Sequence, residues 1–176
     1  MQPGFSLMIL RIYKIKTRLL FIKATLHVMQ VILSANKLIN MSNVVDVVVA
    51  DRNLATMLRS VRAAGLENEL SKSGPFTVLA PTDLAFGKLA AGELLELLKP
   101  ENKVKLAGIL NYHVVEGKTN FKDFKDGQKL KTVNGKQLDV KVVNGEVTIN
   151  GSKVQGKDME ASNGVVHTLD QIMSSK

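Results

Sequence analysis

Apolar residues recur every three or four positions in the first half of the chain, a spacing typical of helices packed against a core. Asn43 precedes a run of valines and has an acidic residue three positions later, so this capping pattern predicts a short helix over 44–50. Asn53 is expected to cap a second helix that Gly65 ends. The core-facing stripe of this second helix comprises Leu54, Met57, Leu58, Val61 and Ala64.

The middle of the chain predicts one short buried strand followed by helices. Residues 76–80 form an apolar run that is rich in strand formers and too short for a helix. Thr82 is placed to cap a helix over 83–89, and residues 93–99 predict another turn or two. A further helix is expected over 100–111, because its first residue is a proline.

The second half changes to the alternating pattern of β-strands. Leu138, Val140 and Val142 alternate with charged residues, and 165–169 form a last strand. Asn-Gly pairs, which tolerate the positive φ of tight hairpin turns, separate these runs. Helices first and strands later predict an α+β fold in which helices pack on an antiparallel sheet. The Asn-Gly pairs stand at 134–135, 144–145, 150–151 and 163–164.

Charge divides the chain at about residue 40. The first 40 residues hold six basic residues and no acidic one, whereas all 16 acidic residues lie between Asp46 and Asp170. The high isoelectric point of about 9.7 therefore owes much to this leader, and the rest is close to neutral. Its lysines alternate along predicted strands, so nucleic acid is not an expected partner. We expect a leader over 1–40 and a single domain over 41–176, long enough to bury its own core.

Three interpretations of the leader remain open. Its longest charge-free run, 24–36, is shorter than the ~20 residues of a membrane-crossing helix, so no integral membrane span is expected. A signal peptide over 1–35, cleaved after Ala35, would make the protein secreted or extracytoplasmic. An amphipathic membrane-surface anchor is a second interpretation. The third is that translation starts at Met41, which would leave a cytoplasmic domain.

The chain carries few of the residues that catalysis or metal binding needs. It has no cysteine, which excludes disulfides, thiolate metal sites and cysteine nucleophiles. No His-x-His, His-Glu-x-x-His or Gly-x-Ser-x-Gly motif is present. We therefore expect no enzymatic activity, no metal and no cofactor. A Ser-His-Asp hydrolase would have to be assembled from residues distant in the sequence.

The two histidines of the domain favour structural roles. Leu106, Leu110 and His113 stand at helical spacing, which places the imidazole on the apolar face of its helix. A buried neutral imidazole needs one donor and one acceptor, and nearby backbone can supply both. His167, within the last predicted strand, has the same interpretation. Asp83 is interpreted as a helix-start carboxylate that the helix dipole favours.

Three blocks of the sequence together resemble a fasciclin (FAS1) domain: residues 76–86, 111–115 and 163–170. The resemblance spans about Ser42 to Ser174. It implies a twisted β-wedge decorated by helices, and a function in adhesion or ligand binding rather than catalysis. The motif positions are Phe76, Pro81, Thr82, Asp83, Phe86, Asn163, Gly164 and His167.

The same resemblance implies candidate contact residues. In animal relatives, the tyrosine of a motif similar to Tyr112-His113, with its flanking apolar residues, is assigned to integrin recognition. An aspartate followed by an aliphatic residue has the same assignment, and Asp158-Met159 stand at its place here, although Gly156 and Lys157 replace the acid and proline before it. The candidate partner-binding residues are therefore Tyr112, His113, Asp158 and Met159. An exposed loop carboxylate is the alternative interpretation of Asp158.

Two functional hypotheses follow from the fold class. The first is a monomeric binding or adhesion module of the fasciclin type that recognises a protein or glycan partner. The second is a carrier that holds a small molecule or lipid in an apolar groove between the helices and the sheet.

Overall fold

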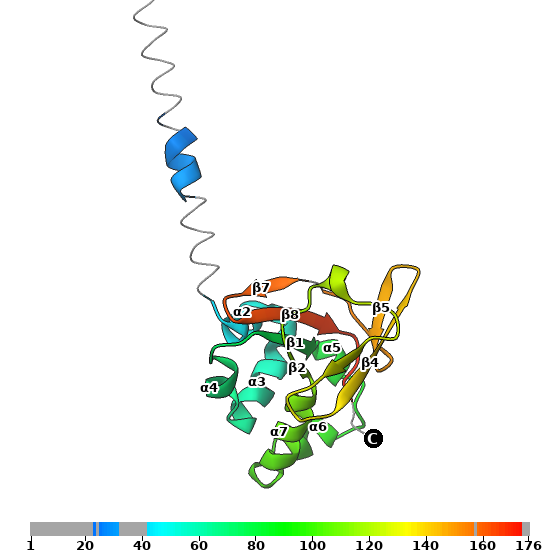
Figure 1. The fold of residues 1–176 in the computed structure, drawn as a ribbon. Coiled ribbons are helices and arrows are strands. Elements are labelled where there is room, and N and C mark those ends of the chain that lie inside the picture. The colour runs from blue at the N-terminus through cyan, green and yellow to red at the C-terminus, as the bar shows by residue number, and fades with distance from the viewer. Residues whose placement is uncertain (1–22, 24, 32–41, 157, 174–176) are drawn as a thin grey trace, which may run out of the picture. The chain divides into compact units, whose positions relative to one another are not determined.

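A computed structural model of the chain describes residues 23, 25–31, 42–156 and 158–173 (Figure 1). The chain divides into two compact units, Met1–Ile39 and Asn40–Lys176. In the first unit, residues 23 and 25–31 are helical. Among the described residues, no helix combines the length and the apolar character that crossing a membrane requires. Ala35 and Met41, on which the interpretations of the leader depend, lie outside the described residues.

Helices and helical turns make up most of the first half of the second unit. The pattern of capping residues and helical apolar spacing predicted this half correctly in outline. In chain order the helical elements are α2 (Val44–Ala50), η1 (Arg52–Leu54), α3 (Ala55–Ala64), α4 (Glu67–Leu70), α5 (Asp83–Phe86), α6 (Glu93–Leu97), η2 (Pro100–Asn102), α7 (Lys103–Tyr112) and, later, η3 (Phe121–Asp123).

The capping predictions hold at α2 and at the end of α3. The Asn43 side chain accepts from two backbone amides of α2, and the Asp46 carboxylate accepts in return from the Asn43 amide at 2.9 Å. Gly65 ends α3 in the left-handed conformation with φ 75°. The prediction that Asn53 caps α3 was wrong. Asp51 instead accepts from the Asn53 amide and starts the turn η1, which leads directly into α3.

Two other helices are shorter or start later than expected. The Thr82 hydroxyl caps α5 as predicted, but the helix ends at Phe86. The proline at position 100 begins a 3₁₀ turn, and the α-helix proper starts only at Lys103. Short 3₁₀ turns are common at helix starts, so the sequence signal was correct for the element and early for its α-helical part.

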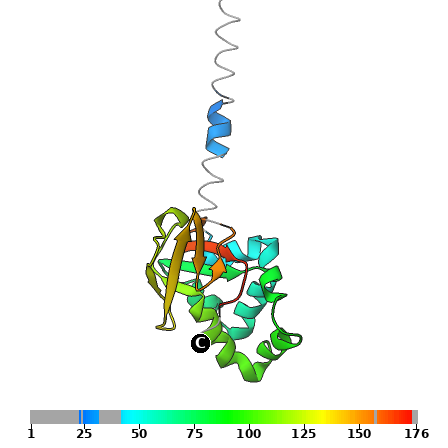
Figure 2. The same ribbon diagram turned by 90° about the vertical axis from the view of Figure 1, so that its right-hand side faces the viewer.

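The strands form two four-stranded sheets. Their orders are β2-β1-β8-β7 and β3-β4-β5-β6, and in Figure 2 the strands of the second sheet run across those of the first. The strands are β1 (Phe76–Pro81), β2 (Val114–Glu116), β3 (Lys129–Lys131), β4 (Gln137–Val143), β5 (Glu146–Ile149), β6 (Ser152–Lys153), β7 (Met159–Ala161) and β8 (Gly164–Leu169).

The central pair of the first sheet, β1 and β8, is parallel. Phe76 lies opposite Gly164 and Pro81 opposite Leu169, so the pair runs the full length of both strands. Every residue of β8 is buried, as in strands covered on both faces. The α+β class is confirmed, but this pair differs from the expected antiparallel arrangement. Parallel strands are not joined by a hairpin, so no turn motif in the sequence indicates that β1 and β8 pair.

Two of the four Asn-Gly pairs form the predicted tight hairpin turns. Asn144 and Asn150 have φ of 51° and 47°, and each precedes a glycine of positive φ that joins antiparallel strands. The pair at 163–164 is different. Gly164 is already the first residue of β8, where it lies opposite Ala161, so the hairpin loop is formed by the two residues before it.

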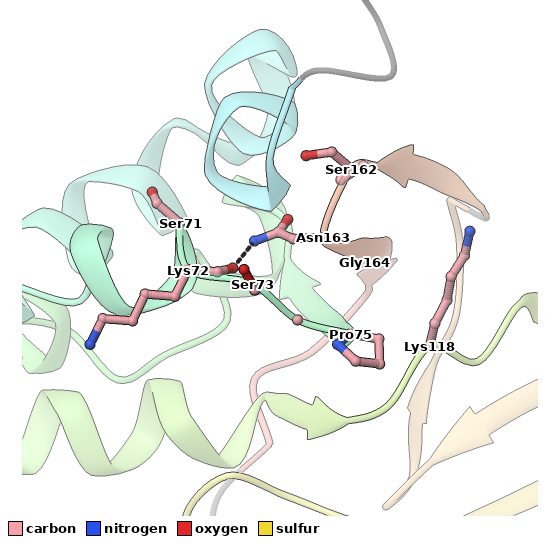
Figure 3. A pocket seen from close by; sticks show the side chains of 10 residues that line it. Ser71, Lys72, Ser73, Pro75, Lys118, Ser162, Asn163 and Gly164 are labelled. Carbon is pink, nitrogen blue, oxygen red and sulfur yellow. Dashed lines mark hydrogen bonds between the residues drawn. The ribbon is translucent and has the colours of Figure 1, made fainter.

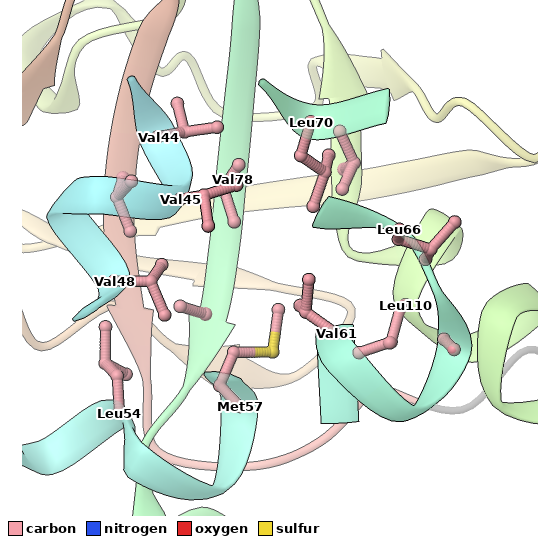
Figure 4. Packing of buried hydrophobic residues seen from close by; sticks show 14 of the residues in the cluster. Val44, Val45, Val48, Leu54, Met57, Val61, Leu66, Leu70, Val78 and Leu110 are labelled. Carbon is pink, nitrogen blue, oxygen red and sulfur yellow. The ribbon is translucent and has the colours of Figure 1, made fainter. Parts of the chain in front are cut away.

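The two faces of β1 pack against two hydrophobic clusters. Val78 and Ala80 face a cluster that includes residues of α2, α3 and α7, which we call the helix-side cluster. Leu79 between them faces a cluster shared with the second sheet. This alternation is the period of a strand. Figure 4 shows Val78 beside the valines of α2 and Met57 of α3. The central sheet is therefore covered by helices on one side and by strands on the other.

Gly164→Ala is expected to lower the free energy of unfolding by about 2 kcal/mol or more. A Cβ built at this position would lie 2.2 Å from the Phe76 carbonyl oxygen, so the central strands would have to separate. Urea unfolding measures the effect. Gly108→Ala is the matched control, because nothing lies within 4 Å of its Cβ position in α7. The control should be stabilised by up to about 1 kcal/mol. Equal stability of the two variants would contradict the close packing of β1 on β8.

Candidate functional site

The segment around Asp158 lies at the free edge of the first sheet. Strand β7 is the last in its order, and Asp158 is an exposed residue directly before it with φ 52°. Its carboxylate Oδ1 accepts from the Phe121 amide at 2.7 Å, and its own amide donates to Nδ1 of His167 at 3.2 Å. The aspartate is therefore exposed but held at a defined position by two hydrogen bonds.

The two residues after Asp158 differ in their surroundings. Met159 is half-buried and packs against the helix-side cluster, so part of its side chain stabilises the fold. Glu160 is exposed and forms an ion pair with Lys118. A solvent-exposed pair of this kind contributes little to stability. Because both side chains are exposed, both charges are accessible to a partner. The edge formed by β7 therefore exposes the carboxylates of Asp158 and Glu160 to solvent beside the backbone of an edge strand.

Two depressions flank this edge. The larger, with a volume of about 500 Å³, is lined by the loop before β1, by the β7–β8 turn and by Lys118 (Figure 3). The smaller, of about 350 Å³, lies between Leu84 of α5 and Met159. Leu84 is 82% exposed, and Asp51 and Asp83 are polar residues of the same depression. We define the edge 158–161 together with these two depressions as the β7 surface.

Asn163 anchors the floor of the larger depression. Its Oδ1 accepts from the Val44 amide at 2.8 Å, and its Nδ2 donates to the carbonyls of Leu70 and Lys72 at 2.8 and 2.7 Å. Figure 3 shows this amide directed at the loop of Lys72. One side chain thus links the turn before β8 to the start of α2 and to the end of α4. The sequence motif singled out Asn163, but no sequence signal identified the three backbone groups that it bonds.

Tyr112 and His113 lie at the end of α7, in the interior. Tyr112 is 5% exposed, and its hydroxyl accepts from Nδ2 of Asn150 at 2.6 Å. His113 is 1% exposed. Within the described part of the chain, no hydrogen bond, ion pair or ring contact joins either residue to Asp158 or Met159. The four candidate residues therefore form two separate groups, of which only the Asp158 group is at the surface.

Both nitrogens of His113 are satisfied by backbone groups. The Ile109 carbonyl can only accept, so Nδ1 carries the proton and donates to it at 2.8 Å. Nε2 then accepts from the Met173 amide at 3.0 Å. Complete burial lowers the pKa of His113 to about 4, although the hydrogen bond to Ile109 raises it in part. The imidazole is neutral at pH 7 and connects α7 to the C-terminal segment.

The residues of the first motif block also connect elements. Asp83 is a helix-start carboxylate, and its Oδ1 additionally accepts from the Thr56 amide at 2.7 Å, which ties α5 to α3. The Thr82 amide donates to the carbonyl of Leu169. Phe86 is buried in the helix-side cluster, and Pro81 ends β1. In the structure, these motif side chains make contacts within the fold.

The helix-side cluster offers almost no room for a ligand. The space enclosed between α2, α3, α4 and β1 is about 10 Å³ and is lined only by apolar residues, among them Val48, Met57 and Leu70. A water molecule alone needs about that volume. Figure 4 shows the valines of α2 directed into the side chains of α3 and β1. Among the described residues, no group of three His, Cys, Asp or Glu side chains could hold a metal ion.

Comparison with known proteins gives one consistent family. A family model described as Fasciclin domain matches residues 52–175. Protein sll1483 of Synechocystis is 43% identical over 130 residues, which cover 74% of this chain and 72% of that protein. Protein sll1735 of the same organism is 37% identical over 133 residues, covering 76% of this chain and 98% of that protein.

More distant similarities come from animals. Transforming growth factor-beta-induced protein ig-h3 of Sus scrofa is 36% identical over 133 residues, covering 76% of this chain but only 19% of that protein. Among solved structures, a FAS1 domain pair from the insect cell adhesion molecule fasciclin I superposes with a TM-score of 0.69 at 18% identity. That match covers 76% of this chain and 51% of the other, and it shows the fold alone.

His113→Ala is expected to lower the free energy of unfolding at pH 7 by about 3 kcal/mol, because it leaves a cavity and orphans the Met173 amide. It should also flatten the pH dependence. In the wild type, the folded-state pKa of about 4 lies below the ordinary value of 6.5, so the unfolded chain takes up the proton first. Stability is therefore complete above pH 6.5 and is lost by up to about 3 kcal/mol between pH 6.5 and 4.

Urea unfolding of both proteins at several pH values measures this prediction. His27→Ala is the matched control, because His27 is exposed on the leader helix and its loss should leave the stability unchanged. A His113→Ala variant with wild-type stability and slope would contradict the interior role of this imidazole.

Proposed function

Because this chain belongs to the fasciclin-domain family, we propose that it is a non-catalytic binding or adhesion module that recognises a protein or glycan partner through the β7 surface. The observation that carries the proposal is the exposed Asp158 carboxylate, held by the Phe121 amide at the edge of the sheet and flanked by two depressions. A carboxylate fixed in this way is preorganised for a charged or hydrogen-bonding partner, so less conformational entropy is lost on binding.

The insect structure supports the class of function by analogy, since it is described as part of a cell adhesion molecule. The burial of Tyr112 and His113 favours the β7 surface over the end of α7 as the contact region. For Tyr112 and His113 we propose an indirect role, in which they hold the second sheet and the C-terminal segment in place.

The carrier hypothesis receives no support from the packing. A lipid or small-molecule ligand would require a cavity of several hundred Å³, whereas the space inside the helix-side cluster is about 10 Å³. The depression of about 350 Å³ between α5 and Met159 is open at the surface and includes the carboxylates of Asp51 and Asp83. Co-purification of a ligand with the native protein, detected by native mass spectrometry, would revive it.

Asp158→Asn should weaken partner capture about tenfold while leaving the melting temperature unchanged. Asparagine keeps the acceptor for the Phe121 amide and tolerates positive φ, so only the charge is removed. The assay coats a surface with the full chain and counts cells of the source organism retained under flow. Glu101→Gln, an exposed carboxylate on η2, is the matched control. Undiminished retention by Asp158→Asn would reject Asp158 as a contact residue.

A binding role in adhesion places the protein outside the cytoplasm, and we propose that residues 1–35 direct its export as a signal peptide. Mass spectrometry of the protein from its native source should then find an N-terminus near residue 36, and cell fractionation should find it outside the cytoplasm. Recovery of a chain that begins at residue 1 or at Met41 would overturn this part of the proposal.

A further inference from the structure

His167 is a buried histidine that contacts the Asp158 segment directly. It lies in β8 with no exposed surface, and its two ring nitrogens face two different loops. Nε2 donates to the Thr119 carbonyl at 2.9 Å, since that oxygen can only accept. Nδ1 is therefore the unprotonated nitrogen, and it accepts from the Asp158 amide at 3.2 Å.

These two bonds complete a connection between β1 and the β7 surface. The Thr119 amide donates to the Thr77 hydroxyl at 2.9 Å, and that hydroxyl donates to the Gly117 carbonyl at 2.7 Å. Thr119 is thus fixed from β1 on one side and from His167 on the other. Two residues further on, Phe121 donates its amide to the Asp158 carboxylate. The imidazole of His167 and the bond from Phe121 to Asp158 together join the loop after β2 to the segment before β7.

The bond to Asp158 requires the lone pair of Nδ1. If that nitrogen takes up a proton, two N–H donors face each other and the bond is lost. The carboxylate of Asp158 is one of two carboxylates that act on this ring, and it belongs to the same residue as the displaced amide. Its attraction to the charged ring would compete with the bond that it accepts from the Phe121 amide. Protonation therefore favours a different arrangement of the segment.

Two charged groups among the described residues act on His167. Asp158 does so from the segment before β7 and Glu160 from β7 itself, where Glu160 is also paired with Lys118. The other packed elements present Leu79 of β1 and the ring of Phe124, whose centroid lies 5.4 Å from that of the imidazole. Burial lowers the pKa of His167, and the Thr119 carbonyl and the two carboxylates raise it in part.

We propose that His167 is the positioning residue of the β7 surface: as the neutral imidazole it holds Asp158 outward for a partner, and when protonated it releases Asp158 and turns the contact off. The effect on partner capture rests on the proposed function. The change in the Asp158 segment on protonation of His167 does not, and we call it the structural half of the inference. Binding is thereby restricted to pH values above the titration of His167. Binding is lost as the pH falls, and not as it rises, because Nδ1 must be an unprotonated acceptor in the binding form.

Amide hydrogen exchange of the full chain, followed by NMR and corrected for intrinsic rates, tests the structural half. Across the pH range in which the His167 ring signals titrate, protection of the Asp158 and Phe121 amides should fall about tenfold, the equivalent of one hydrogen bond. The amide of Val140, bonded to the Gln128 carbonyl in the second sheet, reports any general loosening. The amide of Met173 reports the separate titration of His113.

His167→Gln is the conservative variant. Its amide can accept from Asp158 and donate to Thr119 without titrating, so the segment should stay protected over the whole pH range in which the wild-type ring titrates, and capture should be rescued there. Wild-type capture should fall about tenfold over the same range. Equal protection of Asp158 above and below the titration of the His167 ring, or the same loss in His167→Gln, would overturn the proposal. If this variant does not fold, the wild-type titration decides, since Asp158 protection and the His167 ring signals must share one midpoint.

The two proposals fail differently. If the segment responds to pH but Asp158→Asn captures cells as well as the wild type, the proposed contact is wrong while the structural role of His167 stands. If Asp158→Asn loses capture but the segment does not respond to pH, the proposed function stands and His167 is only a packing residue.

Discussion

The parallel pairing of β1 with β8 is the constraint on which the rest of the domain depends. The two strands are so close at their start that a Cβ on Gly164 would collide with the backbone of Phe76. Both are buried on both faces, so helices must cover one side and the second sheet the other. All three motif blocks meet here, because β2 pairs with β1 on its other side. The motifs encode the contacts of this central sheet.

The same arrangement determines which edge of the first sheet is exposed. With β1 and β8 in the centre and β2 joined to β3 through a bridge at Val115 and Thr132, β7 is the edge that keeps exposed charges beside two depressions. Asp158 stands at its start, and the buried groups behind it belong to the central strands. The exposed Asp158 is in this way hydrogen-bonded to the interior through His167.

The sequence predicted what local chemistry determines. The capping box of Asn43, the terminal Gly65 and the turn at Asn144 each depend on residues a few positions apart, and each is observed. The parallel pairing, the three bonds of Asn163 and the bond between His167 and Asp158 could not be predicted, because they join segments that only the folded chain brings together. Even a local prediction can fail where two capping residues stand close together. Asn53 was expected to cap the helix, but Asp51, two residues earlier, starts the helical turn instead.

The pairing of β1 with β8 also has a consequence for the order of folding. During synthesis, β1 and the helices around it leave the ribosome long before β8 exists, so the centre of the sheet stays open until nearly the whole domain has emerged. Contacts so distant along the chain make folding slow relative to helical domains of similar size. Until that last strand is available, the apolar residues of β1 lack their central partner, so the chain passes through most of its synthesis with this surface uncovered.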